Sequence, residues 1–147
     1  MLLNNSCGVV FLSLVPYRPE VCVWEITLKC NMRCTHCGSR AGKARENELT
    51  LGECFVVAND LIDLGVMHTS FIGGEVFLYE GWEKIARMLA MSGIYVNIVT
   101  NGYLMGDKQI NEIRYAGLGN VVVSLILMNL EGEGLSDVHA FFRKYLA

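Results

Sequence analysis

The feature that most constrains the fold of this 147-residue chain is a regular alternation of short β-rich segments with amphipathic helical segments. Strands that alternate with helices of 10–15 residues indicate βαβ units and a parallel sheet, so the predicted fold class is α/β. A Thr-x-x-Glu capping box predicts that one helix begins after Thr50, and Gly65 ends it. Strands are predicted over 21–28, 69–72, 95–99 and 120–127, and further helices run from Trp82 to Gly93, from a cap at Asp107 to Gly117, and over 138–146.

Length and composition fit one globular domain. With 52% hydrophobic and 18% charged residues, the chain has the material for a core and is not of the disordered class. Both prolines lie in one short stretch, Pro16 to Pro19. We therefore expect an N-terminal leader over 1–19 and a single domain over 20–147.

The charge balance argues against two classes of partner. A net charge of −3 provides no general attraction to nucleic acid or to an anionic membrane surface. The apolar run over 8–15 is too short to span a bilayer, and no basic segment of a signal peptide precedes it. A cytoplasmic location is the resulting expectation.

The cysteines are the strongest indication of function. Three of the six, Cys30, Cys34 and Cys37, lie within eight residues in a C-x3-C-x2-C pattern. Iron–sulfur clusters are held by cysteine thiolates, normally four, so three would leave one iron open to a small molecule. Five basic residues and no acidic residue lie between Lys29 and Arg45, a field that we expect to lower the thiol pKa values.

Two other functional interpretations of the cysteines remain, beside the possibility that the cluster of cysteines has no function. Zinc sites prefer four ligands in two pairs, whereas this loop has one triplet and His36 adjoins Cys37. A dithiol redox site would use Cys34-Thr-His-Cys37 alone, but such a motif should open a helix, and Gly38 follows here.

Three further motifs fall at the ends of predicted strands. Gly73-Gly74-Glu75 follows the second strand, Thr100-Asn101-Gly102 follows the third, and Ser124 lies in the fourth. The working residues of parallel α/β folds gather at the carboxyl ends of strands. We therefore expect these motifs to meet the cysteine loop at one edge of the sheet.

With this order of motifs, the sequence resembles the radical S-adenosylmethionine (radical SAM) superfamily from Pro19 to Ser124. Its C-x3-C-x-φ-C signature matches the three cysteines, with His36 in the φ position, and Gly73-Gly74-Glu75 resembles its GGE motif. The sequence departs from the family at Val76, where proline is usual, and after Ser124, where Leu-Ile-Leu replaces Leu-Asp-Gly. The resemblance leans toward the branch that matures peptides or builds cofactors.

The resemblance implies a [4Fe–4S] cluster and S-adenosylmethionine (SAM) as cofactors, a 5′-deoxyadenosyl radical, and hydrogen abstraction from a substrate such as a peptide or a cofactor precursor. It also implies an electron-donating protein such as a flavodoxin or ferredoxin. No catalytic residue is assigned. The implied sites are Cys30, Cys34 and Cys37 for iron, Gly73, Gly74 and Glu75 for the methionine end, Thr100, Asn101 and Ser124 for the ribose or carboxylate, and His36 near the adenine.

The family folds as a partial (β/α)6 barrel, and only about four βα units are predicted here. The expectation is therefore a truncated barrel whose fourth strand, 121–128, is an exposed apolar edge through which the chain self-associates. An inactive fragment that only binds metal, or a zinc or dithiol module, is the alternative function.

Overall fold

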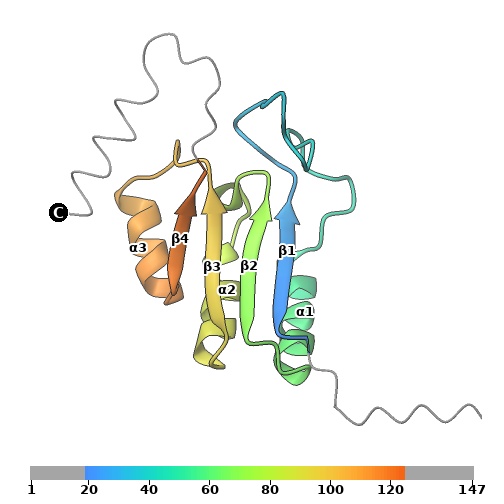
Figure 1. The fold of residues 1–147 in the computed structure, drawn as a ribbon, viewed down its shortest axis with the longest axis vertical. Coiled ribbons are helices and arrows are strands. Elements are labelled where there is room, and N and C mark those ends of the chain that lie inside the picture. The colour runs from blue at the N-terminus through green and yellow to red at the C-terminus, as the bar shows by residue number, and fades with distance from the viewer. Residues whose placement is uncertain (1–18, 125–147) are drawn as a thin grey trace, which may run out of the picture.

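Residues 19–124 are described by a computed structural model of the chain. Four strands alternate with three α-helices, and one short 3-10 helix follows the second strand (Figure 1). The elements are β1 (Val21–Thr27), α1 (Leu51–Asp63), β2 (His68–Gly73), η1 (Val76–Leu78), α2 (Trp82–Met91), β3 (Tyr95–Thr100), α3 (Asp107–Ala116) and β4 (Asn120–Val123).

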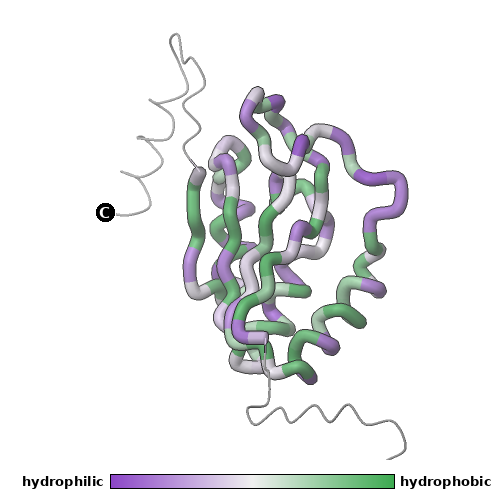
Figure 2. Tube along the Cα trace, turned by 45° about the vertical axis from the view of Figure 1, so that its right-hand side comes forward, coloured by the Kyte–Doolittle hydropathy of each residue, from purple (hydrophilic) through white to green (hydrophobic). Residues whose placement is uncertain are grey.

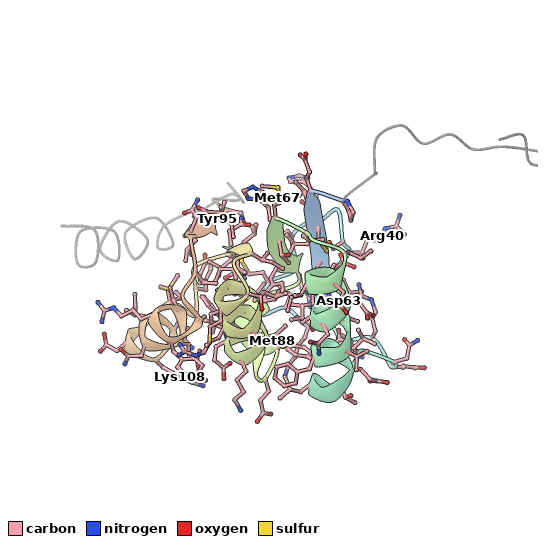
Figure 3. All side chains as sticks on the ribbon, turned by 90° about the horizontal axis from the view of Figure 1, so that it is seen from below. Arg40, Asp63, Met67, Met88, Tyr95 and Lys108 are labelled. Carbon is pink, nitrogen blue, oxygen red and sulfur yellow. The ribbon has the colours of Figure 1, made fainter. Side chains whose placement is uncertain are left out.

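All neighbouring strands are parallel, in the order β1-β2-β3-β4, which confirms the predicted parallel sheet. The three α-helices lie on one face of the sheet, as the view from below shows (Figure 3). A sheet covered on one face, with βα units in sequential order, is the arrangement of a section of a (β/α) barrel. The predicted fold class is therefore confirmed.

The core lies between the sheet and the helices. Phe71 of β2 and Ile98 of β3 are fully buried, as are Ile85 and Leu89 of α2. The Phe71 ring meets Trp24 of β1 edge to face, with the ring centroids 5.5 Å apart. Apolar residues follow the strands, whereas hydrophilic residues gather in the long loop between β1 and α1 (Figure 2).

The helix ends match the sequence signals with one exception. Thr50 and Glu53 form the predicted capping box, and Gly65 and Gly117 adopt the left-handed conformation that ends a helix. The predicted cap at Asp107 is wrong, because Gly106 is the N-cap and Asp107 is the first helical residue. A carboxylate is favourable in that first turn as well.

Some predictions fall outside the described residues: the leader apart from Pro19, the end of the fourth strand beyond Ser124, and the helix over 138–146. Within residues 19–124, none of the helices has the length and apolar character needed to cross a membrane.

Candidate functional site

A pocket of about 260 Å³ lies at the carboxyl-terminal edge of the sheet. The loop between β1 and α1 arches over this edge, where all four strands end (Figure 1). Most of the predicted site residues line this one pocket. Its lining consists of Cys30, Met32, Cys34, Cys37, Ser39, Ala41, Ile72, Gly73, Gly74, Val99, Thr100, Asn101 and Ser124.

The cysteine loop is closed at its base by backbone hydrogen bonds. The Gly42 N–H donates to Leu28 O at 2.8 Å, and the Cys30 N–H donates to Gly42 O at 3.1 Å. Lys29 and Gly42 form a parallel bridge between the two arms of the loop. The loop therefore continues the β1 strand and brings its thiols back over the sheet edge.

Two of the three sulfur atoms accept hydrogen bonds from nearby N–H groups. Cys30 Sγ lies 3.4 Å from the Met32 backbone nitrogen, and Cys37 Sγ lies 3.3 Å from that of Ala41. Such donors stabilise negative charge on sulfur, which is the state in which a thiolate binds metal.

The expected lowering of thiol pKa by the basic field is wrong for Cys34. Burial raises the pKa of the Cys34 thiol, and the neighbouring thiols of Cys30 and Cys37 raise it further. The reason is that Lys29, Arg33, Arg40 and Lys43 are exposed to solvent, where their charge is screened, and Arg45 is paired with Glu25.

Glu48 fastens the base of the cysteine loop to the end of β1. Its carboxylate accepts from the Leu28 N–H at 2.7 Å, from the Thr27 hydroxyl at 2.9 Å, and from the Arg45 N–H at 3.1 Å. Burial alone would raise the pKa of Glu48, but the backbone donors at Leu28 and Arg45 and the Thr27 hydroxyl outweigh it, and the pKa is lowered. One ionised side chain thus holds both arms of the loop.

The glycine turn after β2 packs against the end of β1. A Cβ atom at Gly73 would lie 2.1 Å from Thr27 O, and one at Gly74 would lie 2.1 Å from Lys29 O. The Gly74 N–H donates to Thr27 O at 2.7 Å, and the Glu75 N–H donates to Lys29 O at 2.8 Å. The absence of a side chain at both glycines therefore allows the backbone at the end of β1 to approach this turn closely.

Glu75 is fully buried, and its carboxylate is occupied by donors from the chain itself. It accepts from the Thr100 hydroxyl at 2.8 Å, the Asn101 N–H at 2.9 Å and the Phe77 N–H at 3.3 Å. Burial raises the pKa of Glu75, although these donors oppose the effect. The carboxylate therefore joins the ends of β2 and β3, and it is not among the groups that line the pocket.

The remaining predicted residues divide into two groups. Thr100, Asn101 and Ser124 line the pocket, and the Ser124 N–H is fixed to Thr100 O at 2.9 Å. The structure does not bring His36 to them, because this side chain is exposed, next to the Thr35 hydroxyl, and lies outside the lining.

The donor set fits an iron–sulfur cluster. Cys30, Cys34 and Cys37 are free thiols around one pocket. Among the described residues, no three histidine, cysteine or acidic side chains are placed to hold a single metal ion. A [4Fe–4S] cluster binds each thiolate through a separate iron, so its ligands surround a space and need not converge on one point.

Sequence reasoning missed Glu48 and Asn31. Neither belongs to a motif, and both act through partners on other segments, such as Thr27 for Glu48 and Asn101 for Asn31. The signal for Glu48 in the sequence is weak: it is the second acidic residue after a purely basic stretch, and it lies just before the Thr50 cap.

Comparison with known sequences gives one family. The family model described as the Radical SAM superfamily matches residues 24–145. The chain is 31% identical over 130 residues to the PqqA peptide cyclase of Bradyrhizobium diazoefficiens, covering 85% of this chain and 32% of that protein. It is 33% identical over 127 residues to the Fe-coproporphyrin III synthase of Methanosarcina barkeri, covering 86% and 30%. The chain thus spans about a third of the length of these curated relatives.

A solved structure shares the fold. BtrN, crystallised in complex with AdoMet and 2-DOIA, superposes with a TM-score of 0.65 at 18% sequence identity. The superposition covers 78% of this chain and 48% of BtrN. The parallel sheet with helices on one face is therefore the fold of a known class of proteins.

Proposed function

The chain belongs to the radical SAM superfamily, and we propose that it forms the part of an enzyme that holds a [4Fe–4S] cluster and SAM. The observation that supports this most directly is the common pocket. Three free thiols from one loop and the ends of β2, β3 and β4 line the same 260 Å³ space. The family is one of enzymes that use these two cofactors.

In this proposal Cys30, Cys34 and Cys37 would hold the cluster, which would leave one iron available to the amino and carboxylate groups of SAM. When bound, the cluster supplies the electron that splits SAM to methionine and a 5′-deoxyadenosyl radical, which abstracts hydrogen from the substrate. Gly73 and Gly74 contribute backbone at the methionine end, and Thr100, Asn101 and Ser124 form the wall at the ends of β3 and β4. Glu75 contributes through the position of this wall, since its oxygens are taken by Thr100 and Asn101.

We propose the maturation of a peptide or of a cofactor precursor as the reaction class of the whole protein. The relatives named as a peptide cyclase and as an iron-coproporphyrin synthase support it. The chemistry needs a one-electron donor, for which a flavodoxin or ferredoxin is suitable. A reducing compartment such as the cytoplasm keeps the thiols available, and we propose that location.

The test is anaerobic reconstitution of the full chain with iron and sulfide, followed by visible spectra and by EPR of the reduced protein with and without SAM. We expect a brown protein whose EPR signal changes when SAM is added. Cys34→Ala should abolish the colour. Cys22→Ala should keep it, because Cys22 lies on β1 away from the pocket.

The other outcomes discriminate among the alternatives. A colourless wild-type chain that takes up zinc would overturn the cluster assignment in favour of a zinc or dithiol module. A brown chain whose EPR signal does not change when SAM is added would refute the cofactor pocket. It would favour the alternative of a fragment that only binds metal.

A further inference from the structure

One side chain from the end of β3 reaches a sulfur atom of the cysteine loop. Asn101 Nδ2 lies 3.9 Å from Cys30 Sγ, although the two residues are 71 positions apart in sequence. The same nitrogen donates to Asn31 Oδ1 at 2.8 Å. Because a side-chain amide carries two N–H donors, one can serve Asn31 while the other serves the sulfur.

The orientation of the Asn101 amide is determined by its other contacts. The Tyr103 backbone N–H donates to Asn101 Oδ1 at 3.0 Å, so the oxygen must face Tyr103. The nitrogen therefore faces Cys30 and Asn31, and the reversed assignment of the amide would place two acceptors, the Asn101 and Asn31 oxygens, against each other.

The backbone of Asn101 is held in place from β2. The Asn101 N–H donates to Glu75 at 2.9 Å, and the Thr100 hydroxyl donates to the other oxygen of the same carboxylate at 2.8 Å. The Glu75 N–H in turn donates to Lys29 O, the residue before Cys30. Hydrogen bonds thus lead from Cys30 through Asn101 and Glu75 back to the residue before Cys30.

We propose that Asn101 tunes the redox potential of the cluster through an N–H···S hydrogen bond to Cys30, with Glu75 as the positioning residue that holds Asn101. This inference rests on the proposed function, since it requires a cluster on Cys30. A donor to the thiolate sulfur stabilises the reduced cluster more than the oxidised one, because the reduced cluster carries one more negative charge, and it therefore raises the potential. The Met32 donor to the same sulfur belongs to the backbone, so Asn101 is the donor that a substitution can remove.

The experiment compares the wild-type chain with Asn101→Leu, which keeps the approximate shape of the side chain and removes its donors. Both are reconstituted anaerobically, matched for iron and sulfide content, and poised at a series of potentials without SAM while EPR reports the reduced fraction. Loss of one net hydrogen bond should shift the reduction equilibrium about fivefold. At 59 mV per tenfold for one electron, the midpoint should fall by ~40 mV.

A matched control is Asn97→Leu, the same substitution on the same strand. Asn97 accepts from the Ser70 hydroxyl at 2.6 Å and does not line the pocket. The midpoint potential of the cluster in Asn97→Leu should therefore equal that of the wild type. Asn101→Gln retains an amide donor, so its midpoint potential should lie between those of Asn101→Leu and the wild type. Glu75→Gln should also lower the midpoint potential. Thr100 and Asn101 donate to different oxygens of the Glu75 carboxylate, and glutamine has only one acceptor oxygen.

An Asn101→Leu chain with a full cluster and the wild-type potential would overturn the proposal, even if its thermal stability fell. If Asn101→Leu takes up no cluster, the smaller Asn101→Val gives the same comparison with the same expected direction. A wild-type chain that takes up no cluster would refute the proposed function and this inference together, whereas a normal cluster with an unshifted variant refutes the role of Asn101 alone.

Discussion

Replacing Glu48 with glutamine should lower the free energy of unfolding by about 2 kcal/mol at neutral pH. Glutamine keeps one carbonyl oxygen for the N–H groups of Leu28 and Arg45, but it removes the negative charge from both bonds. Bonds to charged acceptors contribute about 1 kcal/mol more than neutral ones, which gives about 2 kcal/mol for the pair. The Arg45 guanidinium lies 4.0 Å away and is partly exposed, so it adds little.

This difference should depend on pH in a defined direction. The pKa of Glu48 is lowered from its ordinary value of 4.5, so the folded chain favours the ionised form. Its contribution is therefore present in full above about pH 4.5 and is lost as the pH falls through the lowered folded value. The gap between wild type and Glu48→Gln should be widest near pH 7 and should shrink toward pH 3.

Urea unfolding followed by circular dichroism at pH 7, 5 and 3 measures this gap. At pH 7 the midpoint of Glu48→Gln should lie roughly 1–2 M urea below that of the wild type. Taking the difference between the two chains cancels other carboxylates, such as Glu53, whose pKa is lowered by its bonds to Thr50. Glu46→Gln is the control, because Glu46 is exposed in the same loop and its change should stay within about 0.5 kcal/mol. A gap that is absent at pH 7, or equal at pH 7 and pH 3, would refute the role of Glu48.

Three further predictions concern stability and assembly. Glu75→Ala should lower the free energy of unfolding by about 3 kcal/mol or more, because it leaves the buried Thr100 hydroxyl and the half-buried N–H groups of Asn101 and Phe77 without an acceptor; a wild-type melting temperature would contradict this. Gly74→Ala should prevent normal folding, since its Cβ would lie 2.1 Å from Lys29 O. Gly52→Ala on helix α1, where the nearest atom to the new Cβ is Thr50 Oγ1 at 4.0 Å, should stabilise the fold by about 0.5–1 kcal/mol, and circular dichroism melts that rank the two variants alike would count against the close approach. Among residues 19–124, β4 is an edge strand of the sheet, and its outer edge should lead to self-association, which light scattering would disprove by finding a monodisperse monomer.

The elements of the fold could be predicted because each carries a local signal. The capping box at Thr50 and the terminal glycines fixed the helix limits, and the alternation of strands and helices determined the parallel sheet. The site cysteines and the glycine turn were found in the same way, because both are short motifs at strand ends. Their meeting in one pocket follows from the common direction of the strands.

The hydrogen bonds within the site could not be predicted, because they join segments that are distant in sequence. Nothing near Glu75 in sequence indicates that its carboxylate bonds to Thr100 and Asn101, 25 and 26 positions later, and is itself left out of the pocket lining. The outcome is decided by the β2–β3 register and by the burial of η1, and hydrophobic periodicity does not encode either. The same holds for Glu48, whose partners are fixed only when the loop folds back on β1.

The contact between Asn101 and Cys30 also has a consequence for the order of events during synthesis. At a translation rate of about 5–20 residues per second, the thiol of Cys30 is made about 4–14 s before the amide that lies beside it in the folded chain. During that interval the three cysteines exist without the β3 end that completes their pocket, open to oxidation or to adventitious zinc. Chains synthesised in air should therefore carry modified thiols more often than chains synthesised without oxygen, even when both end in the same fold.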